Sequence, residues 1–287
     1  MNTYYTVKAT LKRIRWRMRR ASVRKRYRLD DLRDSPVLFG TAIPKSGSHL
    51  IIQVLRGFAK LGPFVISGFP PVNRGEDNMK LENEAVIENL QQMRSGDIGY
   101  GYLHYKEPFI STLTDSNWAA IFVYRDPRDV IVSSVKYATQ MNLEHGLHVY
   151  YTQHLQTDEE RINAAIQGIQ LPEFEYPNIS DRYNSYIGWL HEAGVFSVRY
   201  EDMILNQKKT FSYLLDYVIE RGFQPHISRE RALEVLQQSV QPQNSGTFRK
   251  GQPGSWKENF SDRNKDTFKR VTGNLLVRLG YEENHNW

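Results

Sequence analysis

Short apolar runs that alternate with helical patterns dominate the sequence. Four runs have the length of buried strands: residues 37–43 (VLFGTAI), 98–105 (IGYGYLHY), 119–124 (AAIFVY) and 195–200 (VFSVRY). Helical spacing of apolar residues fills much of the chain between and after them, over residues 49–61, 81–93, 128–140, 183–192, 206–221 and 228–240. The pattern predicts an α/β fold, a single domain with a central, mainly parallel sheet flanked by helices. Residues 63–80 and 142–180 show no clear periodicity and are expected to be irregular.

The N-terminal residues 7–28 predict one further helix, which differs from the rest in its charge. Its apolar residues recur at intervals of 4, 3, 4 and 3 and so share one face: Val7, Leu11, Ile14, Met18 and Ala21. We expect this stripe to dock on the body of the protein. Two alternatives stay open, peripheral contact with an anionic membrane and binding to an acidic partner or nucleic acid. We divide the chain into this basic amphipathic segment, residues 1–34, and a domain over residues 35–287.

The charge of the chain is unevenly distributed. The net charge is +6, from 38 Lys and Arg against 32 Asp and Glu. Residues 8–28 hold eleven of the basic residues and no acidic one, so the remaining 27 are outnumbered by the 32 acids. The high isoelectric point therefore belongs to one segment, and we expect no nucleic-acid partner for the domain.

Composition excludes several kinds of chemistry. The chain has 287 residues, of which 40% are hydrophobic and 24% charged, as is usual for a globular protein. It has no Cys, which excludes disulfides, thiolate metal ligands and Cys nucleophiles. No apolar run approaches the roughly 18–20 residues of a membrane span, and the N-terminus is charged where a signal peptide is apolar. We therefore expect a cytoplasmic location.

The segment between the first strand and the helix after it, residues 44–49, favours an anion site. Backbone N–H groups at a helix start attract anions. In PKSGSH, Gly47 permits close backbone approach, Ser46 and Ser48 add hydroxyl donors and Lys45 adds positive charge. A nucleotide-triphosphatase loop instead places Lys directly after Gly. The strand at 119–124 is followed directly by Arg125 and not by an Asp that could hold a metal, so the loop favours a phosphate group bound without an obligate metal.

Two more cationic segments occur downstream. In VYRDPRDVIVSS, Arg125 ends a strand, and Ser133 lies two turns into the helix that follows, so both can reach a phosphate near the strand end. In FRKGQPGSWK, three basic residues and two glycines occupy ten positions, and Arg249, Lys250 and Gly251 are consecutive among them. The alternatives are an Arg–Asp surface pair with a helix-packing Ser for the first segment, and a solvated basic turn for the second.

In this order and spacing, PKSGSH, RDPRDVIVSS and RKGQPGSWKENF resemble the family of sulfotransferases that use 3′-phosphoadenosine 5′-phosphosulfate (PAPS). The similarity runs from about residue 36 to residue 260 and is greatest to the soluble, cytosolic-type branch. It implies transfer of a sulfuryl group from PAPS, as co-substrate and without a metal, to a hydroxyl or amine of a small-molecule acceptor.

The resemblance also implies roles for individual residues. The 5′-phosphosulfate would be held by the loop residues Lys45, Ser46, Gly47, Ser48 and His49. Lys45 would stabilise charge on the bridging oxygen as the sulfuryl group leaves. The 3′-phosphate would be bound from one side by Arg125 and Ser133, and from the other by Arg249, Lys250 and Gly251. Tyr200, in VRYEDM, would lie near the adenine.

His104 is the expected catalytic base, since a neutral imidazole can take the proton of the attacking acceptor group. The sequence departs from the family close to this residue. Tyr102 stands where the family has Lys, and Lys106 is the nearest substitute for that charge. Leu50 stands where the family has a Trp that stacks on adenine.

We expect the pocket for the acceptor between residues 63–80 and 140–180, which carry aromatic residues such as Phe64 and Tyr151 and several His. Alternatives are a carbohydrate or glycolipid sulfotransferase and, from other classes, a nucleotide kinase or a membrane-associated binding protein. The sequence leaves the oligomeric state open.

Overall fold

The computed structural model describes residues 3–172, 174–241 and 253–287. The chain forms two compact units. The first consists of Met1–Tyr124 and Gly188–Gln241, and the second of Arg125–Ile187 and Pro242–Trp287.

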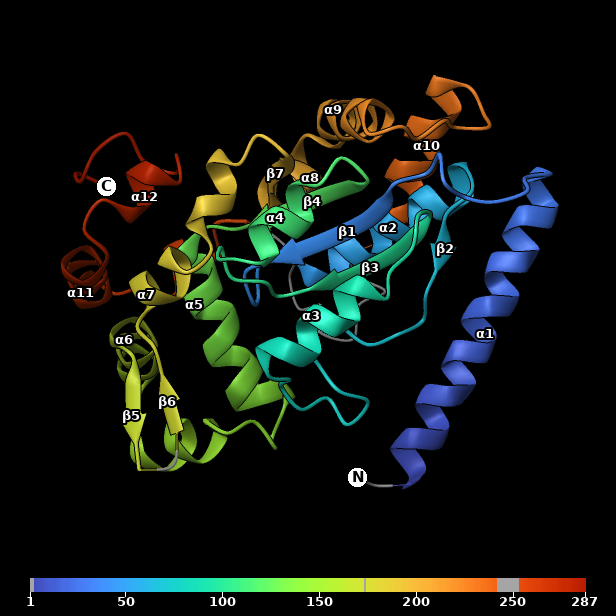
Figure 1. Ribbon diagram of the computed structural model, residues 1–287. Helices are drawn as coiled ribbons and strands as arrows, with labels where there is room; N and C mark the ends of the chain where they lie inside the picture. Colours follow the sequence, from blue (N-terminus) through green and yellow to red (C-terminus); the bar gives the residue numbers. More distant parts are fainter. Residues whose placement is uncertain (1–2, 173, 242–252) are drawn as a thin grey trace. The chain divides into compact units, whose positions relative to one another are not determined.

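A five-stranded sheet forms the centre of the first unit (Figure 1). Every neighbouring pair of its strands is parallel, as predicted. In spatial order the strands are β2 (Val65–Ile66), β3 (Asp97–Gly101), β1 (Val37–Ala42), β4 (Trp118–Tyr124) and β7 (Val195–Arg199). β1 is buried along its whole length, which explains its unbroken apolar sequence. β3 ends at Gly101, earlier than its apolar pattern predicts.

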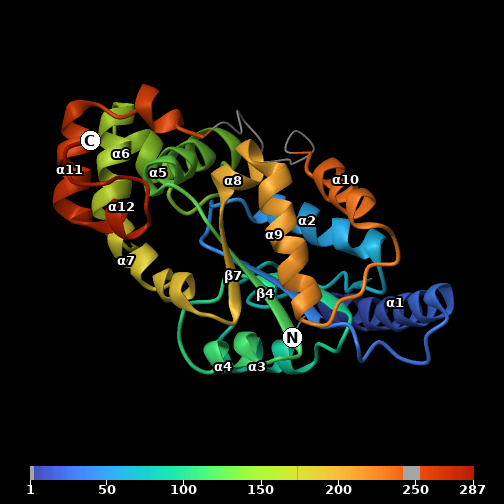
Figure 2. The same cartoon turned by 90° about the horizontal axis from the view of Figure 1, so that it is seen from above.

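Helices cover both faces of this sheet (Figure 2). One face carries α2 (Ser48–Leu61), α9 (Gln207–Glu220) and α10 (Arg229–Ser239), and the other carries α3 (Asn83–Gln91) and α4 (Phe109–Thr114). α8 (Tyr200–Leu205) follows β7 directly. The core on the α2 face joins fully buried helix residues such as Phe58 and Leu214 to strand residues such as Leu38 and Ile121. The predicted α/β fold is thus confirmed.

The N-terminal helix α1 (Thr3–Tyr27) docks by a different face from the one we expected. Its buried contact is Trp16, whose Nε1 donates to Asp97 Oδ1 at 2.9 Å, and Arg20 pairs with the same oxygen at 2.6 Å. The stripe that includes Leu11 and Met18 is exposed. The docking prediction was wrong because carboxylates of the body, Asp97 and Glu76, attract the cationic face of the helix.

The second unit is mainly helical and adds a two-stranded antiparallel hairpin. Its elements are α5 (Pro127–Lys136), the π-helices η1 (Tyr137–Met141) and η2 (Tyr150–His154), α6 (Asp158–Gln167), β5 (Ile169–Leu171), β6 (Phe174–Tyr176), α7 (Ile179–Asn184), the 3-10 helix η5 (Ser255–Glu258), α11 (Asp262–Thr272) and α12 (Leu275–Arg278). A further 3-10 helix, η3 (Ile187–His191), spans the junction of the two units in the chain. The region 142–180 is therefore more regular than expected. Its helix α6 begins with a capping box between Thr157 and Glu160, a sequence signal that the apolar pattern alone does not register.

Asp97 is buried and accepts hydrogen bonds from Trp16, Arg20 and the backbone N–H of Arg94. We expect Asp97→Ala to lower the free energy of unfolding by about 3 kcal/mol, because it leaves buried donors and a cation without their acceptor. Urea unfolding would measure the loss.

The matched control is Glu234→Ala, which breaks an exposed pair with Arg231 and should cost less than about 0.5 kcal/mol. Equal losses in the two variants would contradict the role assigned to Asp97.

Candidate active site

The loop between β1 and α2 has the backbone geometry of an anion site. Lys45 and Gly47 adopt positive φ angles of 70° and 104°. Gly47 immediately precedes α2 and provides no side-chain cap. The Leu50 and Ile51 N–H groups donate to the Gly47 carbonyl at 2.9 and 3.0 Å, which leaves those of Ser48 and His49 for another acceptor. Ser46 is fully buried, and its Oγ has no hydrogen-bond partner within the described ranges. These features suit a phosphate or sulfate group.

Tyr200 packs directly against this loop. A Cβ atom built on Gly47 would lie 2.5 Å from Cδ2 of the Tyr200 ring. Position 47 therefore requires glycine for two reasons: its backbone is left-handed, and the aromatic ring beside it leaves no room for a side chain. The structure thus brings together two segments that lie more than 150 residues apart in the sequence and that we assigned to the same ligand.

His104 follows Leu103, whose backbone N–H and carbonyl are both hydrogen-bonded to side chains. The Leu103 N–H donates to Thr41 Oγ1 at 3.1 Å, and the Leu103 carbonyl accepts from Trp189 Nε1 at 2.9 Å. Thr41 and Trp189 are both fully buried. Since Thr41 pairs with Gly101 in the sheet, the residues after β3 emerge at the same sheet edge as Lys45 after β1. His104 and the loop thus share one edge, and the two residues that hold Leu103 were missed by sequence reasoning.

Two histidines near this edge have lowered pKa values. For His104, loss of hydration lowers the pKa first, and the positive charges of Lys106 and Lys80 lower it further. For His49, burial and the nearby Lys45 ammonium lower the pKa in the same way. Both rings are therefore neutral at pH 7, and His104 is in the form that accepts a proton.

In the second unit, Arg125 lies just before α5 and Ser133 lies within it. Asp126 caps this helix by accepting from the Arg128 N–H, and Pro127 occupies its first turn, as the Asp-Pro sequence predicts. Arg125 pairs with Asp129 at 3.3 Å, one turn along. Ser133 lies one further turn along on the same side, by the four-residue spacing of a helix.

Asp129 ties this helix to the C-terminal basic segment. Its carboxylate accepts from the Gly254 N–H at 2.8 Å, the Ser255 hydroxyl at 3.0 Å and the Trp256 N–H at 2.9 Å. The Arg128 guanidinium stacks on the Trp256 ring at 3.9 Å. Two motifs that the sequence places far apart therefore meet at Asp129.

The sequence assigned no role to Asp129. Arg249, Lys250 and Gly251, which we assigned to the 3′-phosphate, lie outside the described residues. The chain is described again from Pro253, next to the residues that Asp129 holds.

The aromatic residues that we expected around the acceptor do not all line a pocket. Phe64 packs edge-on against Phe58 and close to Phe223 in the core, so its assignment to a pocket was wrong. In the second unit, Tyr151 is buried as well.

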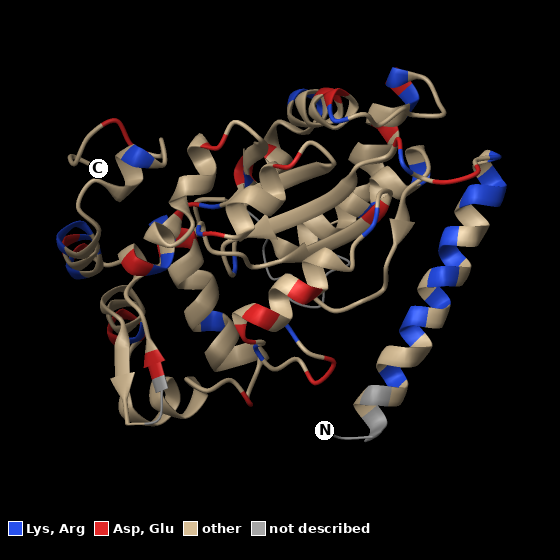
Figure 3. Ribbon diagram, viewed as in Figure 1, with Lys and Arg blue, Asp and Glu red and all other residues tan. Residues whose placement is uncertain are grey.

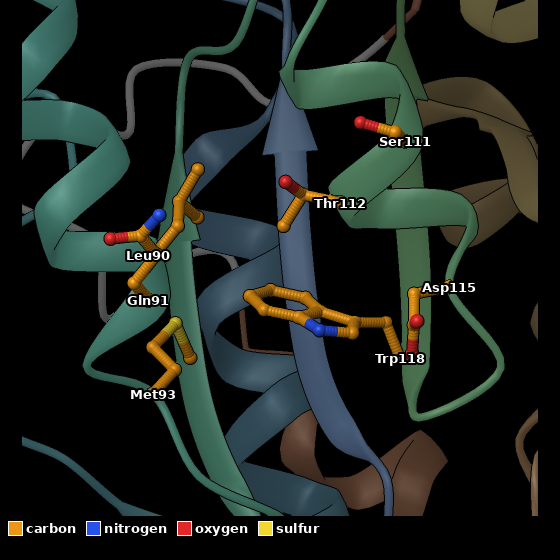
Figure 4. A pocket seen from close by; sticks show the side chains of 7 residues that line it. All are labelled: Leu90, Gln91, Met93, Ser111, Thr112, Asp115 and Trp118. Carbon is orange, nitrogen blue, oxygen red and sulfur yellow. The ribbon is translucent and has the colours of Figure 1, made fainter.

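A cavity of about 290 Å³ lies between α3 and α4, beside Trp118 at the amino end of β4 (Figure 4). The loop that contains Lys45 follows the carboxyl end of β1, which is parallel to β4. The cavity therefore lies at the opposite edge of the sheet from the anion site.

In the parts of the chain that the structure describes, no three His, Asp or Glu side chains are grouped to hold a metal ion. No helix in the same ranges has the length and apolar character needed to cross a membrane.

The sequence matches one known protein family over most of its length. The sulfotransferase domain family matches residues 37–280, a range that runs through both compact units. The chain belongs to this family. The match begins after α1, and the separate status of residues 1–34 stays a prediction. No curated protein matches the sulfotransferase chain.

Two solved structures match the chain at low sequence identity. The crystal structure of mouse sulfotransferase SULT7A1 complexed with PAP is 15% identical, with a TM-score of 0.60 over 88% of this chain and 86% of that one. Retinol dehydratase in a complex with retinol and PAP is 14% identical, with a TM-score of 0.49 over 87% and 83% of the two chains. The first likeness supports the α/β sulfotransferase fold.

We expect Gly47→Ala to destabilise this protein by about 1–3 kcal/mol, because a side chain there meets both an unfavourable backbone angle and the Tyr200 ring. Gly146→Ala is the control, since a Cβ at position 146 has no neighbour within 4 Å. Denaturant unfolding of both variants measures the difference. A Gly47 variant as stable as the Gly146 variant would show that the loop relaxes freely.

Proposed function

We propose that this protein transfers a sulfuryl group from PAPS to a hydroxyl or amine of a small-molecule acceptor. The observation that carries the proposal is the loop before α2, where a left-handed Gly47, an uncapped helix start and the buried Ser46 hydroxyl converge. The family match supports the reaction class. The similar mouse structure is complexed with PAP, which agrees with a nucleotide ligand for this loop.

In the proposed reaction, the loop residues 45–49 bind the 5′-phosphosulfate through backbone N–H groups and hydroxyls. The acceptor oxygen or nitrogen attacks sulfur in line with the bridging oxygen. A new bond forms from the acceptor to sulfur while the bond from sulfur to the bridging oxygen breaks. The electron pair leaves with that oxygen, where the Lys45 ammonium stabilises the developing charge.

His104 receives the proton that the acceptor gives up. Its lowered pKa keeps the ring neutral at pH 7, and the held backbone of Leu103 fixes its position at the sheet edge. Positioning and charge stabilisation supply most of the acceleration, as in phosphoryl transfer.

We assign the 3′-phosphate to Arg125, Ser133 and the segment of Arg249, Lys250 and Gly251. The support is that Asp129, one helical turn from Arg125, anchors residues 254–256, which closely follow Gly251 in the sequence. Two groups of donors from distant parts of the chain suit a dianionic group.

Binding of adenosine 3′,5′-bisphosphate, the nucleotide product, tests this proposal. Titration calorimetry should detect it in the wild type, and Lys45→Ala should weaken it about tenfold or more, because a charge-assisted contact is lost. Lys60→Ala, an exposed Lys at the other end of α2, should bind like the wild type. Absence of binding in the wild type would refute the assignment.

His104→Ala should lower turnover by about 10²–10⁴-fold and leave binding of the bisphosphate intact. The assay uses radiolabelled PAPS with an acceptor found by screening, and His285→Ala, at an exposed site, is the control. In the wild type, the rate should fall with decreasing pH as His104 gains a proton. Because its pKa is lowered, the midpoint of this fall should lie below the ordinary 6.5. Near-normal turnover of His104→Ala, or a midpoint above 6.5, would remove His104 from this role.

A further inference from the structure

The outward face of α1 carries an apolar stripe that the body of the protein leaves uncovered. Val7, Leu11, Ile14 and Met18 are 53%, 48%, 49% and 66% exposed. Their spacing places them in one line that is about 16 Å long at 1.5 Å per residue. We call these four residues the outer stripe.

The opposite face of the helix is committed to the first unit. Trp16 is buried against the edge of the sheet and donates to Asp97, and Arg20 pairs with the same carboxylate. Lys12 pairs with Glu76 at 2.7 Å, and Arg19 donates to the carbonyl of Ile66 at 3.0 Å. These contacts fix the orientation of α1, so the outer stripe is held on the surface of the protein.

The basic residues of α1 fall into two groups with different surroundings. Those of the inner face pair with the body. The side chains of Arg15, Arg17 and Lys25 make no hydrogen bond or ion pair to any residue that the structure describes. By the 100° step of a helix, Arg15 and Arg17 lie on either side of the outer stripe, and Lys25 continues its line beyond Met18. Figure 3 shows Lys and Arg along the length of α1.

We propose that this outward face binds the surface of an anionic membrane. An apolar line flanked by cations is complementary to a bilayer that offers acyl chains below and negative headgroups beside them. The helix would lie flat in the interface, held to the protein by its inner face. The inference is independent of the transfer reaction proposed above.

A second copy of this chain is a poorer occupant of the same face. A symmetric contact between two outer stripes would bring the flanking Arg15 and Arg17 of each copy close to those of the other. Like charges across such an interface repel, and nothing acidic on this face of α1 offsets them.

Co-sedimentation with vesicles tests the proposal on the full chain. We expect binding to vesicles of phosphatidylglycerol and phosphatidylcholine, little binding to phosphatidylcholine alone, and weakening by salt. Ile14→Glu should lower the partition about tenfold or more, because it places a carboxylate among the acyl chains. Arg15→Gln should lower it about fivefold. Leu205→Glu, which adds the same charge at a site 67% exposed, is the matched control and should bind like the wild type.

A single engineered thiol gives a readout that does not depend on the charge variants. Since the chain has no Cys, Met18→Cys can be labelled at one position with an environment-sensitive dye. Its emission should shift to the blue with anionic vesicles, whereas a dye on Leu205→Cys should not shift.

Three outcomes would each overturn the proposal. They are equal binding to neutral vesicles, vesicle binding unchanged by Ile14→Glu, and a concentration-dependent dimer that Ile14→Glu abolishes. In the third case, a second copy is the occupant of the outer stripe.

Discussion

The parallel pairing of β1 with β3 on one side and β4 on the other is the constraint on which the candidate site depends. It places the carboxyl ends of three strands at one edge and fixes which residues leave the sheet there. The register in which Thr41 lies opposite Gly101 lets the Thr41 hydroxyl hold the backbone just before His104. A slip of one residue would turn Thr41 to the other face of the sheet and release that contact.

Features that depend on a few consecutive residues could be predicted from the sequence. The glycine turn at position 47, the Asp126-Pro127 helix start and most of the strands are of this kind. Contacts between distant residues could not be predicted in this way. Thr41 and Trp189 meet Leu103 across 62 and 86 residues, and their side chains carry no local sign of that role. The hydrogen bond from Gly254 to Asp129, which lie 125 residues apart, could not be predicted for the same reason.

The N-terminal helix shows a different reason for failure. Its periodicity correctly identifies an apolar face, and the hydrophobic effect favours burying such a face. Which face docks is decided by the partner surface, and there Asp97 and Glu76 offer charges that the sequence of the helix alone does not reveal. Trp16, an isolated aromatic residue in the cationic face, was the one local sign of the docked side.

The anchoring of Gly254 and Trp256 on Asp129 also bears on the order in which the molecule is completed. A ribosome delivers Asp129 long before the residues that satisfy its carboxylate. Until then, the Asp129 carboxylate lacks three of its hydrogen bonds, and burying it with Arg125 as its partner but without those donors would be unfavourable. Final closure of the second unit therefore waits until residues 254–256 have emerged during translation.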